Sequence, residues 1–188
     1  MFHQSGIVLL ISAIQFLGWQ NATRQEEPCF VIPNSDVLVV IANQPNCPIE
    51  FVDVYSVAYL DGGGRDIYRI RNRATKPIMG YTIATIHSTG TGGEHSLARK
   101  DPKDYFLPGE IKPSSPKDLH LNIIPLTDQL RAKYHINGEM KFIKIFMVVR
   151  VEFADGSKYD ATSEYESLKK FFEENPIEME KEDRRKTQ

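Results

Sequence analysis

The chain has 188 residues, of which 41% are hydrophobic and 26% are charged, and this composition is typical of a globular domain with a packed core. Its net charge of -2 argues against a general nucleic-acid or anionic-membrane binder, because such proteins carry a basic surplus. The 11 prolines and 12 glycines are scattered singly, which favours a turn-rich β protein over a helical bundle.

Residues 1–22 are predicted to be a signal peptide or N-terminal anchor. Residues 6–19 (GIVLLISAIQFLGW) are almost wholly apolar, and at about 14 residues they are shorter than the roughly 20 that a membrane span needs. We expect export to the periplasm or beyond, with cleavage near residues 18–22. An uncleaved membrane anchor and a buried N-terminal element are the alternatives.

The chain contains two cysteines, Cys29 and Cys47. In an exported protein an even count permits one disulfide bond. A loop of this size would give roughly 3 kcal/mol of stabilisation in the chain-entropy account. We therefore expect a Cys29–Cys47 bond, and the alternative is two unpaired thiols near the surface.

The hydrophobic pattern predicts a flexible lead over residues 23–35 and one β domain over residues 36–162. A three-strand meander over residues 49–88 organises this domain, with turns at residues 61–64 and 72–76. Residues 90–116 are expected to be irregular, and Asp155-Gly156 is the strongest hairpin signal. The expected strands cover residues 36–42, 49–60, 65–71, 77–88, 119–123, 141–153 and 157–161.

The strand over residues 141–153 is the clearest in the chain. Period-two alternation places six apolar side chains on one face, namely Ile143, Ile145, Met147, Val149, Val151 and Phe153. The other face carries Lys144, Arg150 and Glu152, and is expected to be partly covered through Phe142, Phe146 and Val148. One or two helical turns are possible over residues 127–134. A further helix is expected over residues 163–175, with Ser163 as N-cap, Glu166 at capping-box spacing and an apolar stripe of Leu168, Phe171 and Phe172. The charged residues 176–188 are expected to be a disordered tail.

These elements predict an all-β fold, an antiparallel immunoglobulin-like β-sandwich of about seven to eight strands with a short C-terminal helix. The stretch from Ile70 to Ile78 (IRNRATKPI), followed by an apolar strand and later by Leu107-Pro108-Gly109, resembles small exported bacterial immunoglobulin-like or fibronectin-III-like domains. The resemblance covers about residues 47–160. It implies a fold and a compartment outside the cytoplasm, and no particular activity.

A row of cations is the most informative surface feature. It consists of Arg65, Arg69, Arg71, Arg73 and Lys76, and the arginines share one strand parity. Guanidinium groups match carboxylate and phosphate in a fork, so this row is a candidate site for an anionic polymer, a phosphate-bearing envelope glycan or an acidic protein. The alternative is a solvated strand face that is paired with Asp or Glu across the sheet.

No catalytic, metal or cofactor motif is present in the sequence, so none is predicted. The chain has no Gly-x-Ser-x-Gly, and two Ser-x-x-Lys matches, at Ser114 and Ser167, lack the companion motifs of penicillin-interacting enzymes. The histidines show no short metal-ligand spacing. Aromatic residues gather on the meander, and we expect them in the core, although an exposed set would form a sugar-stacking platform: Phe51, Tyr55, Tyr59, Tyr68 and Tyr81.

The sequence therefore favours an exported, non-enzymatic binding or scaffolding module of the bacterial cell envelope. Its expected partner is a protein or an anionic envelope glycan, with no nucleic acid, and with membrane contact only through an uncleaved leader. The alternative is a glycan-acting enzyme or its accessory carbohydrate-binding domain, which requires exposed tyrosines. A structural module without a dedicated ligand is a third reading.

Overall fold

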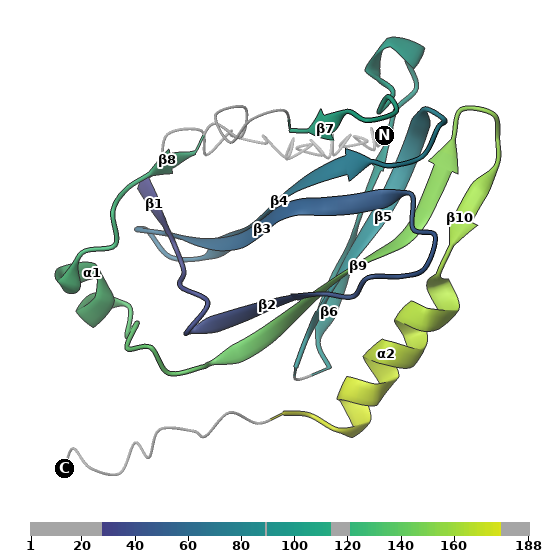
Figure 1. Ribbon diagram of the computed structural model, residues 1–188. Coiled ribbons are helices and arrows are strands. Elements are labelled where there is room, and N and C mark those ends of the chain that lie inside the picture. Colours follow the sequence, from purple (N-terminus) through teal and green to yellow (C-terminus); the bar gives the residue numbers. More distant parts are fainter. Residues whose placement is uncertain (1–27, 89, 114–120, 178–188) are drawn as a thin grey trace, which may run out of the picture.

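The structure, a computed structural model, describes residues 28–88, 90–113 and 121–177. The predicted leader (residues 1–22) and nearly all of the predicted charged tail lie outside these residues. The described chain is mostly β and forms two sheets, with a helix near its C-terminal end (Figure 1). No helix within the described residues is both long enough and apolar enough to cross a membrane.

Sheet A has the strand order β7-β4-β3-β1-β8. Its central strands are β3 (Ile49–Tyr59) and β4 (Gly64–Asn72), which pair as an antiparallel hairpin. Short strands flank this hairpin on both sides: β7 (Ile111–Lys112) beside β4, then β1 (Pro28–Val31) and β8 (Asn122–Ile123) beyond β3.

Sheet B has the order β10-β9-β5-β6. Its long strands are β5 (Ile78–His87) and β9 (Phe142–Phe153), which pair antiparallel. At the edges, β6 (Gly92–Ala98) pairs with β5 and β10 (Lys158–Asp160) pairs with β9. Strand β2 (Val37–Ile41) runs parallel to the first half of β9.

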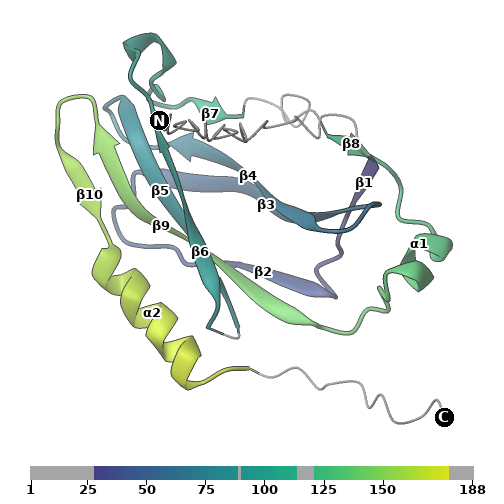
Figure 2. The ribbon, with the colours of Figure 1, turned by 180° about the vertical axis from the view of Figure 1, so that it is seen from behind.

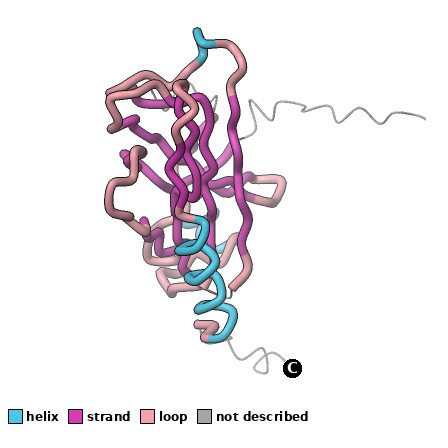
Figure 3. The backbone as a smooth tube through the Cα atoms, turned by 90° about the vertical axis from the view of Figure 1, so that its right-hand side faces the viewer, coloured by secondary structure: helices cyan, strands magenta, loops and turns pink. Residues whose placement is uncertain are grey.

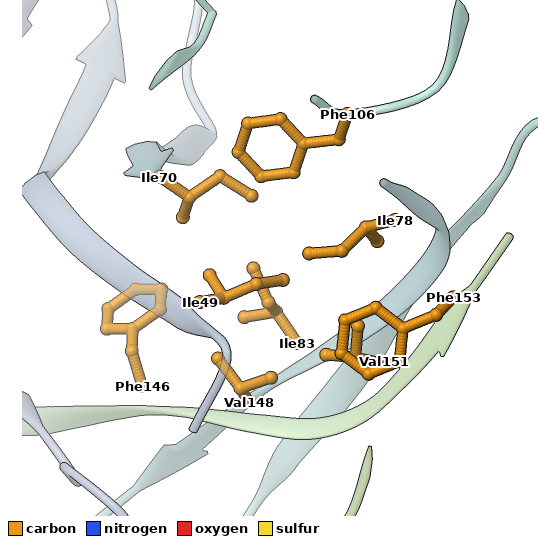
Figure 4. Close-up of a cluster of buried hydrophobic side chains, with 9 residues drawn as sticks. All are labelled: Ile49, Ile70, Ile78, Ile83, Phe106, Phe146, Val148, Val151 and Phe153. Atoms are coloured by element: carbon orange, nitrogen blue, oxygen red, sulfur yellow. The ribbon is translucent and has the colours of Figure 1, made fainter. Parts of the chain in front are cut away.

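The two sheets lie face to face around one hydrophobic core (Figure 4). Ile49 and Ile70 enter this core from sheet A, and Ile83, Phe146 and Val148 enter it from sheet B. Phe106, from the loop after β6, closes the core at the end where β4 leads into β5, and its side chain is 1% exposed.

Helix α2 (Thr162–Glu174) packs against the outer face of sheet B. In the rear view it follows β10 at the lower left of the molecule (Figure 2). Its Tyr165 and Phe172 pack against alternate residues of β9, including Ile145 and Met147. The turn between β5 and β6 meets this helix so closely that a Cβ atom on Gly90 would lie 2.8 Å from the Glu173 backbone. Helix α1 (Asp128–Lys133) and the 3-10 turn at Pro102–Asp104 lie in the connections outside the sheets.

The predicted three-strand meander is wrong in one respect, because its third strand belongs to the other sheet. The chain crosses from β4 in sheet A to β5 in sheet B through residues 73–77. Asn72, fully buried, fixes this crossing: its Nδ2 donates to the carbonyl oxygens of Lys76 (2.9 Å) and Phe106 (2.8 Å), and its Oδ1 accepts from the Ala74 amide (2.9 Å). The Asn and Lys of the IRNRATKPI stretch are therefore parts of one closed turn.

The predicted single apolar face of residues 141–153 is also wrong beyond Val149. The pairing of β9 with β5 shifts register there, with Thr82 opposite Arg150 and Ile83 opposite Val148. Such a β-bulge adds one residue and reverses the parity of the residues after it. Ile145, Met147 and Val149 therefore face α2, whereas Val151 and Phe153 join the core between the sheets.

Four local predictions also need correction. Residues 28–31, expected in a flexible lead, form β1, and residues 92–98, expected to be irregular, form β6. Ser163 is not the N-cap of α2: the N-cap is Ala161, and the Asp160 carboxylate instead accepts from the Thr162 amide at 2.8 Å. Phe171 of the predicted apolar stripe is 55% exposed.

The predicted Cys29–Cys47 disulfide does not form, and both cysteines are free thiols. Cys29 lies in β1 opposite Tyr59, at the end of β3, whereas Cys47 precedes the start of β3. A strand of 11 residues spans roughly 30 Å, and a disulfide requires Cα atoms within about 7 Å. Cys29 and Cys47 are close along the chain but far apart in the folded structure.

Candidate functional site

The predicted cation row divides into three parts. Arg69 and Arg71 lie on the outer face of sheet A, opposite acidic residues of β3. The Arg69 guanidinium is 2.6 Å from Asp53, and the Arg71 guanidinium is 3.0 Å from Glu50. Arg69 also donates to the carbonyl oxygen of Pro113 (3.4 Å). These two arginines thus serve mainly the sheet itself, as the solvated-face alternative expects.

The rest of the row lies at the two ends of β4. Arg65 is exposed near the hairpin turn and has no carboxylate partner among the described residues. Arg73 and Lys76 lie at the other end, in the turn that leads to β5, and they line a pocket of about 710 Å³. The structure therefore separates Arg65 from Arg73 and Lys76, which the sequence had grouped in one row.

Three connections converge on this pocket, at the end of the molecule where β4 leads into β5 (Figure 1). They are the loop between β2 and β3, the turn between β4 and β5, and the β9–β10 hairpin. The view from the right-hand side of Figure 1 shows the strands in the middle of the molecule and loops around them (Figure 3). Loops from both sheets meet at the pocket, because β3 and β4 belong to sheet A and β9 and β10 belong to sheet B. The lining residues are Gln44, Asn46, Cys47, Pro48, Arg73, Ala74, Thr75, Lys76, Phe153, Ser157, Lys158 and Tyr159.

Hydrogen bonds tie these three connections to one another and to the sheets. The Arg73 amide donates to the carbonyl oxygen of Pro48 (2.8 Å), which joins the β4–β5 turn to the β2–β3 loop. The Lys76 ammonium donates to the Ser157 hydroxyl (3.1 Å), which joins the same turn to the hairpin. Gln44 donates from its side chain to the carbonyl oxygen of Val148 (3.0 Å). The pocket walls are therefore held in place before any ligand arrives.

The pocket lining is cationic. It contains Arg73, Lys76 and Lys158, and no Asp or Glu is among the lining residues that the structure describes. Lys76 is 2.7 Å from Asp155, and Lys158 is 2.7 Å from Glu152, so acids outside the lining partly neutralise both ammonium groups. Arg73 is exposed and has no carboxylate partner within the described part of the chain. It is the lining cation with the most charge to offer to an anion.

The thiol in the pocket is not activated as a nucleophile. Burial raises the pKa of Cys47, and this outweighs the opposing influences of the Ile49 backbone, the Tyr159 hydroxyl and the Arg73 charge. The thiol donates to the carbonyl oxygen of Ile49 at 3.1 Å. Burial, together with the nearby Cys47, also raises the pKa of the Tyr159 hydroxyl. Neutral pH therefore leaves both groups protonated, which suits hydrogen bonding more than covalent chemistry.

A second polar cluster lies between the sheets, away from this pocket. The Ser56 hydroxyl donates to Asp66 (2.7 Å) and accepts from the Lys144 ammonium (3.2 Å), and Lys144 also pairs with Asp66. The arrangement brings a serine and a lysine together, but an ammonium paired to a carboxylate has no lone pair with which to take the serine proton. We interpret the cluster as a satisfied charge pair between the two layers.

The aromatic residues of the meander pack in cores. Tyr59 is 5% exposed, Tyr55 packs against the same small cluster on the outer face of sheet A, and Tyr81 packs against the main core. Desolvation raises the pKa of Tyr81, as burial of a phenol does. The sugar-stacking platform that the glycan-acting alternative requires is therefore not formed by these rings.

Compared with protein-family models, with curated proteins and with solved structures, the chain finds no match. Within the described residues, no three His, Cys, Asp or Glu side chains gather closely enough to hold a metal ion.

The sequence pointed to Arg73 and Lys76 but missed the rest of the pocket. Cys47, Lys158 and Tyr159 are distant along the chain and carry no motif. Two signals did mark the place: the asparagine- and proline-rich loop at residues 43–48 and the Asp155-Gly156 turn. Both are loops, and they lie beside the β4–β5 turn only because β2 and β10 pair with β9 and β3 pairs with β4.

Proposed function

We propose that this chain is an exported, non-enzymatic binding module of the bacterial cell envelope that holds an anionic group in the pocket beside Arg73. The observation that carries the proposal is a pre-formed pocket whose lining holds three cations and no carboxylate. Concave sites of about 300–1,000 Å³ are the usual places for small ligands or for one unit of a polymer.

We also infer that the two sheets form an immunoglobulin-like sandwich, and the strand order supports this inference. If β3, β4 and β5 stand for strands A, B and C, then β7 takes the place of E beside β4. On the other sheet, β9 and β10 take the places of F and G beside β5. These neighbours are those of strands A-B-E and C-F-G in the immunoglobulin fold.

This correspondence gives the pocket a position with a known use. The β4–β5 turn becomes the B–C loop, and the β9–β10 turn becomes the F–G loop. In antibody variable domains, loops B–C and F–G lie together at the end of the sandwich that binds antigen. Loops on a rigid sheet scaffold combine fixed geometry with freedom in side-chain choice, which favours recognition.

The charge pattern favours a carboxylate or phosphate as the bound group. Arg73 can offer a bidentate fork to either anion, and Lys76 and Lys158 can each add a point charge. The hydroxyl of Ser157 and the amides of Gln44 and Asn46, all on the pocket wall, can bind the sugar hydroxyls around the anion. An acidic glycan supplies both kinds of group.

Calorimetric titration of the purified protein tests this proposal. The probes are trigalacturonic acid for carboxylate, inorganic pyrophosphate for phosphate, and maltotriose as the neutral sugar. We expect binding of at least one anionic probe, weakening as salt rises, and no binding of maltotriose. Equal binding of all three, or of none, would contradict the proposal.

A matched pair of variants locates the site. Arg73→Gln removes the pocket guanidinium, and we expect about tenfold weaker binding, since a charge-assisted hydrogen bond contributes roughly 1.5 kcal/mol. Arg65→Gln removes an equally exposed arginine from the far end of β4 and should leave affinity unchanged. Equal losses in the two variants would place binding on the strand face and refute the pocket.

A further inference from the structure

Strand β6, at the edge of sheet B, is the longest of the edge strands among the described residues. β6 has 7 residues, all exposed except the half-buried Leu97, and contains no proline or lysine. Natural proteins usually shield such an edge with proline, lysine, a bulge or a short strand, because its unpaired backbone groups are a template for another strand. Here the edge is extended and lacks most of these devices.

Two hydrogen bonds at the ends of the β5–β6 pair show which backbone groups of β6 bond to β5 and which point away from it. At one end the Arg99 amide donates to Met79 (2.9 Å), and at the other the His87 amide donates to Thr91 (2.7 Å). In an antiparallel pair, hydrogen-bonded positions alternate along each strand. The odd-numbered residues of β6 therefore bond to β5. The even-numbered residues point their N–H and C=O groups outward, and these are Gly92, Glu94, Ser96 and Ala98.

The strands at the other sheet edges are shorter than β6. Strands β7, β8 and β10 have 2, 2 and 3 residues. The outer edge of β2 is partly closed by its own flanking turns, since Val37 donates to Pro33 and Ile41 accepts from Asn43. Among the described residues, β6 is therefore the longest strand at the end of either sheet order, and a strand of six or seven residues could add along its full length.

We propose that β6 pairs antiparallel with β6 of a second copy of this chain, so that two B sheets join across a two-fold axis at His95. This inference rests on the backbone of β6 and is independent of anion binding at the pocket. In this register Glu94 lies opposite Ser96 of the second copy, and Gly92 lies opposite Ala98. All outward-facing groups of both strands are then paired.

The side chains suit this register. A register centred on Glu94 would instead place two carboxylates directly opposite one another, which destabilises a strand pair. Centring on His95 avoids that contact, and Glu94 keeps its ion pair with Arg150 on the same chain (3.2 Å). Leu97 lies opposite Gly93 of the second copy, where a Cβ atom would meet no atom within 4 Å. The glycine therefore leaves room for the leucine side chain.

Sedimentation velocity measures this association directly. A single strand pair is a small interface, so we expect a reversible dimer that fills as the protein is concentrated from about 5 to about 500 µM. Ser96→Pro removes an outward N–H and should leave a folded monomer over this whole range. Ser96→Ala removes the Ser96–Thr82 hydroxyl bond (2.9 Å) but keeps the N–H, and it should dimerise like the unaltered chain.

Cysteine cross-linking tests the register and does not depend on the fold of the proline variant. In the proposed pair His95 faces His95 of the second copy, and facing positions in antiparallel strands have Cα atoms within disulfide range. His95→Cys should form a cross-linked dimer on mild oxidation, above the background of the unaltered chain. Leu97→Cys should not, because the two substituted positions lie roughly 13 Å apart in this register.

Either of two results would overturn the proposal. One is a chain that remains monomeric at the highest concentration. The other is cross-linking of Leu97→Cys as efficient as that of His95→Cys, which would show an unspecific encounter or another register.

Discussion

At the scale of single residues, a buried asparagine holds together the part of the molecule on which the pocket is built. Asn72 uses both atoms of its side-chain amide to close the β4–β5 turn and to hold the loop that carries Phe106. Its backbone also pairs with that loop, since its N–H donates to Glu110 and its carbonyl accepts from Gly109. Arg73 follows directly, so its position in the pocket depends on this residue.

Replacement of Asn72 by alanine should therefore be costly. It leaves the amide of Ala74 without its partner and removes the side-chain hydrogen bonds to the carbonyl oxygens of Lys76 and Phe106, of which the second still accepts from the Ile78 amide. We expect the free energy of unfolding to fall by roughly 2–4 kcal/mol. Urea denaturation followed by fluorescence measures the loss. Asn122→Ala, at an exposed position in β8, should change stability by less than about 0.5 kcal/mol. A loss at Asn72 no larger than that at Asn122 would contradict the role assigned to it.

A second residue-scale prediction concerns pH. Burial, and then the positive charge of Lys144, lower the pKa of His87 below its ordinary value of 6.5. The unfolded chain thus binds a proton at a higher pH than the folded chain does. The preference of the folded chain for neutral His87 therefore stabilises the protein fully above pH 6.5. This stabilisation is lost as the pH falls from 6.5 toward the lower pKa of His87 in the folded state.

Denaturation of the unaltered chain between pH 7.5 and pH 5 should show this loss, since that range stays above the ordinary pKa values of the carboxylates. His87→Gln should reduce the slope of stability against pH. His95→Gln, at an exposed position on β6, should keep the slope of the unaltered chain. Equal slopes for all three proteins would show that burial does not lower the pKa of His87 and would contradict this prediction.

At the scale of elements, α2 shows how a helix is positioned by the strand beneath it. Phe171 and Phe172 are adjacent in sequence, yet the first is 55% exposed and the second is 8% exposed. Phe172 packs on the outward residues of β9, including Ile145, Met147 and Val149. The bulge that ends this outward run also turns Val151 and Phe153 into the core, so a single extra residue gives β9 two different apolar faces.

The two phenylalanines therefore form a matched pair of substitutions. Phe172→Ala should lower the free energy of unfolding by about 3 kcal/mol, because it opens a cavity between helix and sheet. Phe171→Ala should cost less than about 1 kcal/mol. Thermal or urea denaturation distinguishes them, and the reverse ranking would mean that α2 presents its other side to the sheet.

The same elements show what sequence reasoning can reach. Period-two alternation located β3, β4, β5 and β9 within a residue or two, because each is long and buries a face. It missed β6, whose residues GGEHSLA lie exposed at an edge and so carry no apolar alternation. It also missed the bulges, since the register of β9 is set by its partner β5 and not by its own sequence. The same holds for the pocket. The sequence identified Arg73, but the residues around it come from loops that are brought together only by strand pairing.

At the scale of the whole molecule, a long strand places residues that are close in sequence far apart in space. Cys29 and Cys47 are separated by the full length of β3, although few residues lie between them. If the native protein is unfolded without reductant, iodoacetamide should therefore add two carbamidomethyl groups to each chain, one at each free cysteine. A chain that takes up none would hold a disulfide, which is incompatible with the pairing of β1 beside Tyr59.

The whole-molecule account places recognition at the end of the two sheets beside Arg73. Titration of the isotope-labelled protein with whichever of trigalacturonic acid and pyrophosphate binds more tightly in calorimetry, followed by amide chemical shifts, tests this placement most directly. We predict that shifts concentrate in residues 44–48, 73–76 and 157–159, where the three connections line the pocket. Shifts centred on Arg65, Arg69 and Arg71 of β4, or no shifts at all, would contradict the account.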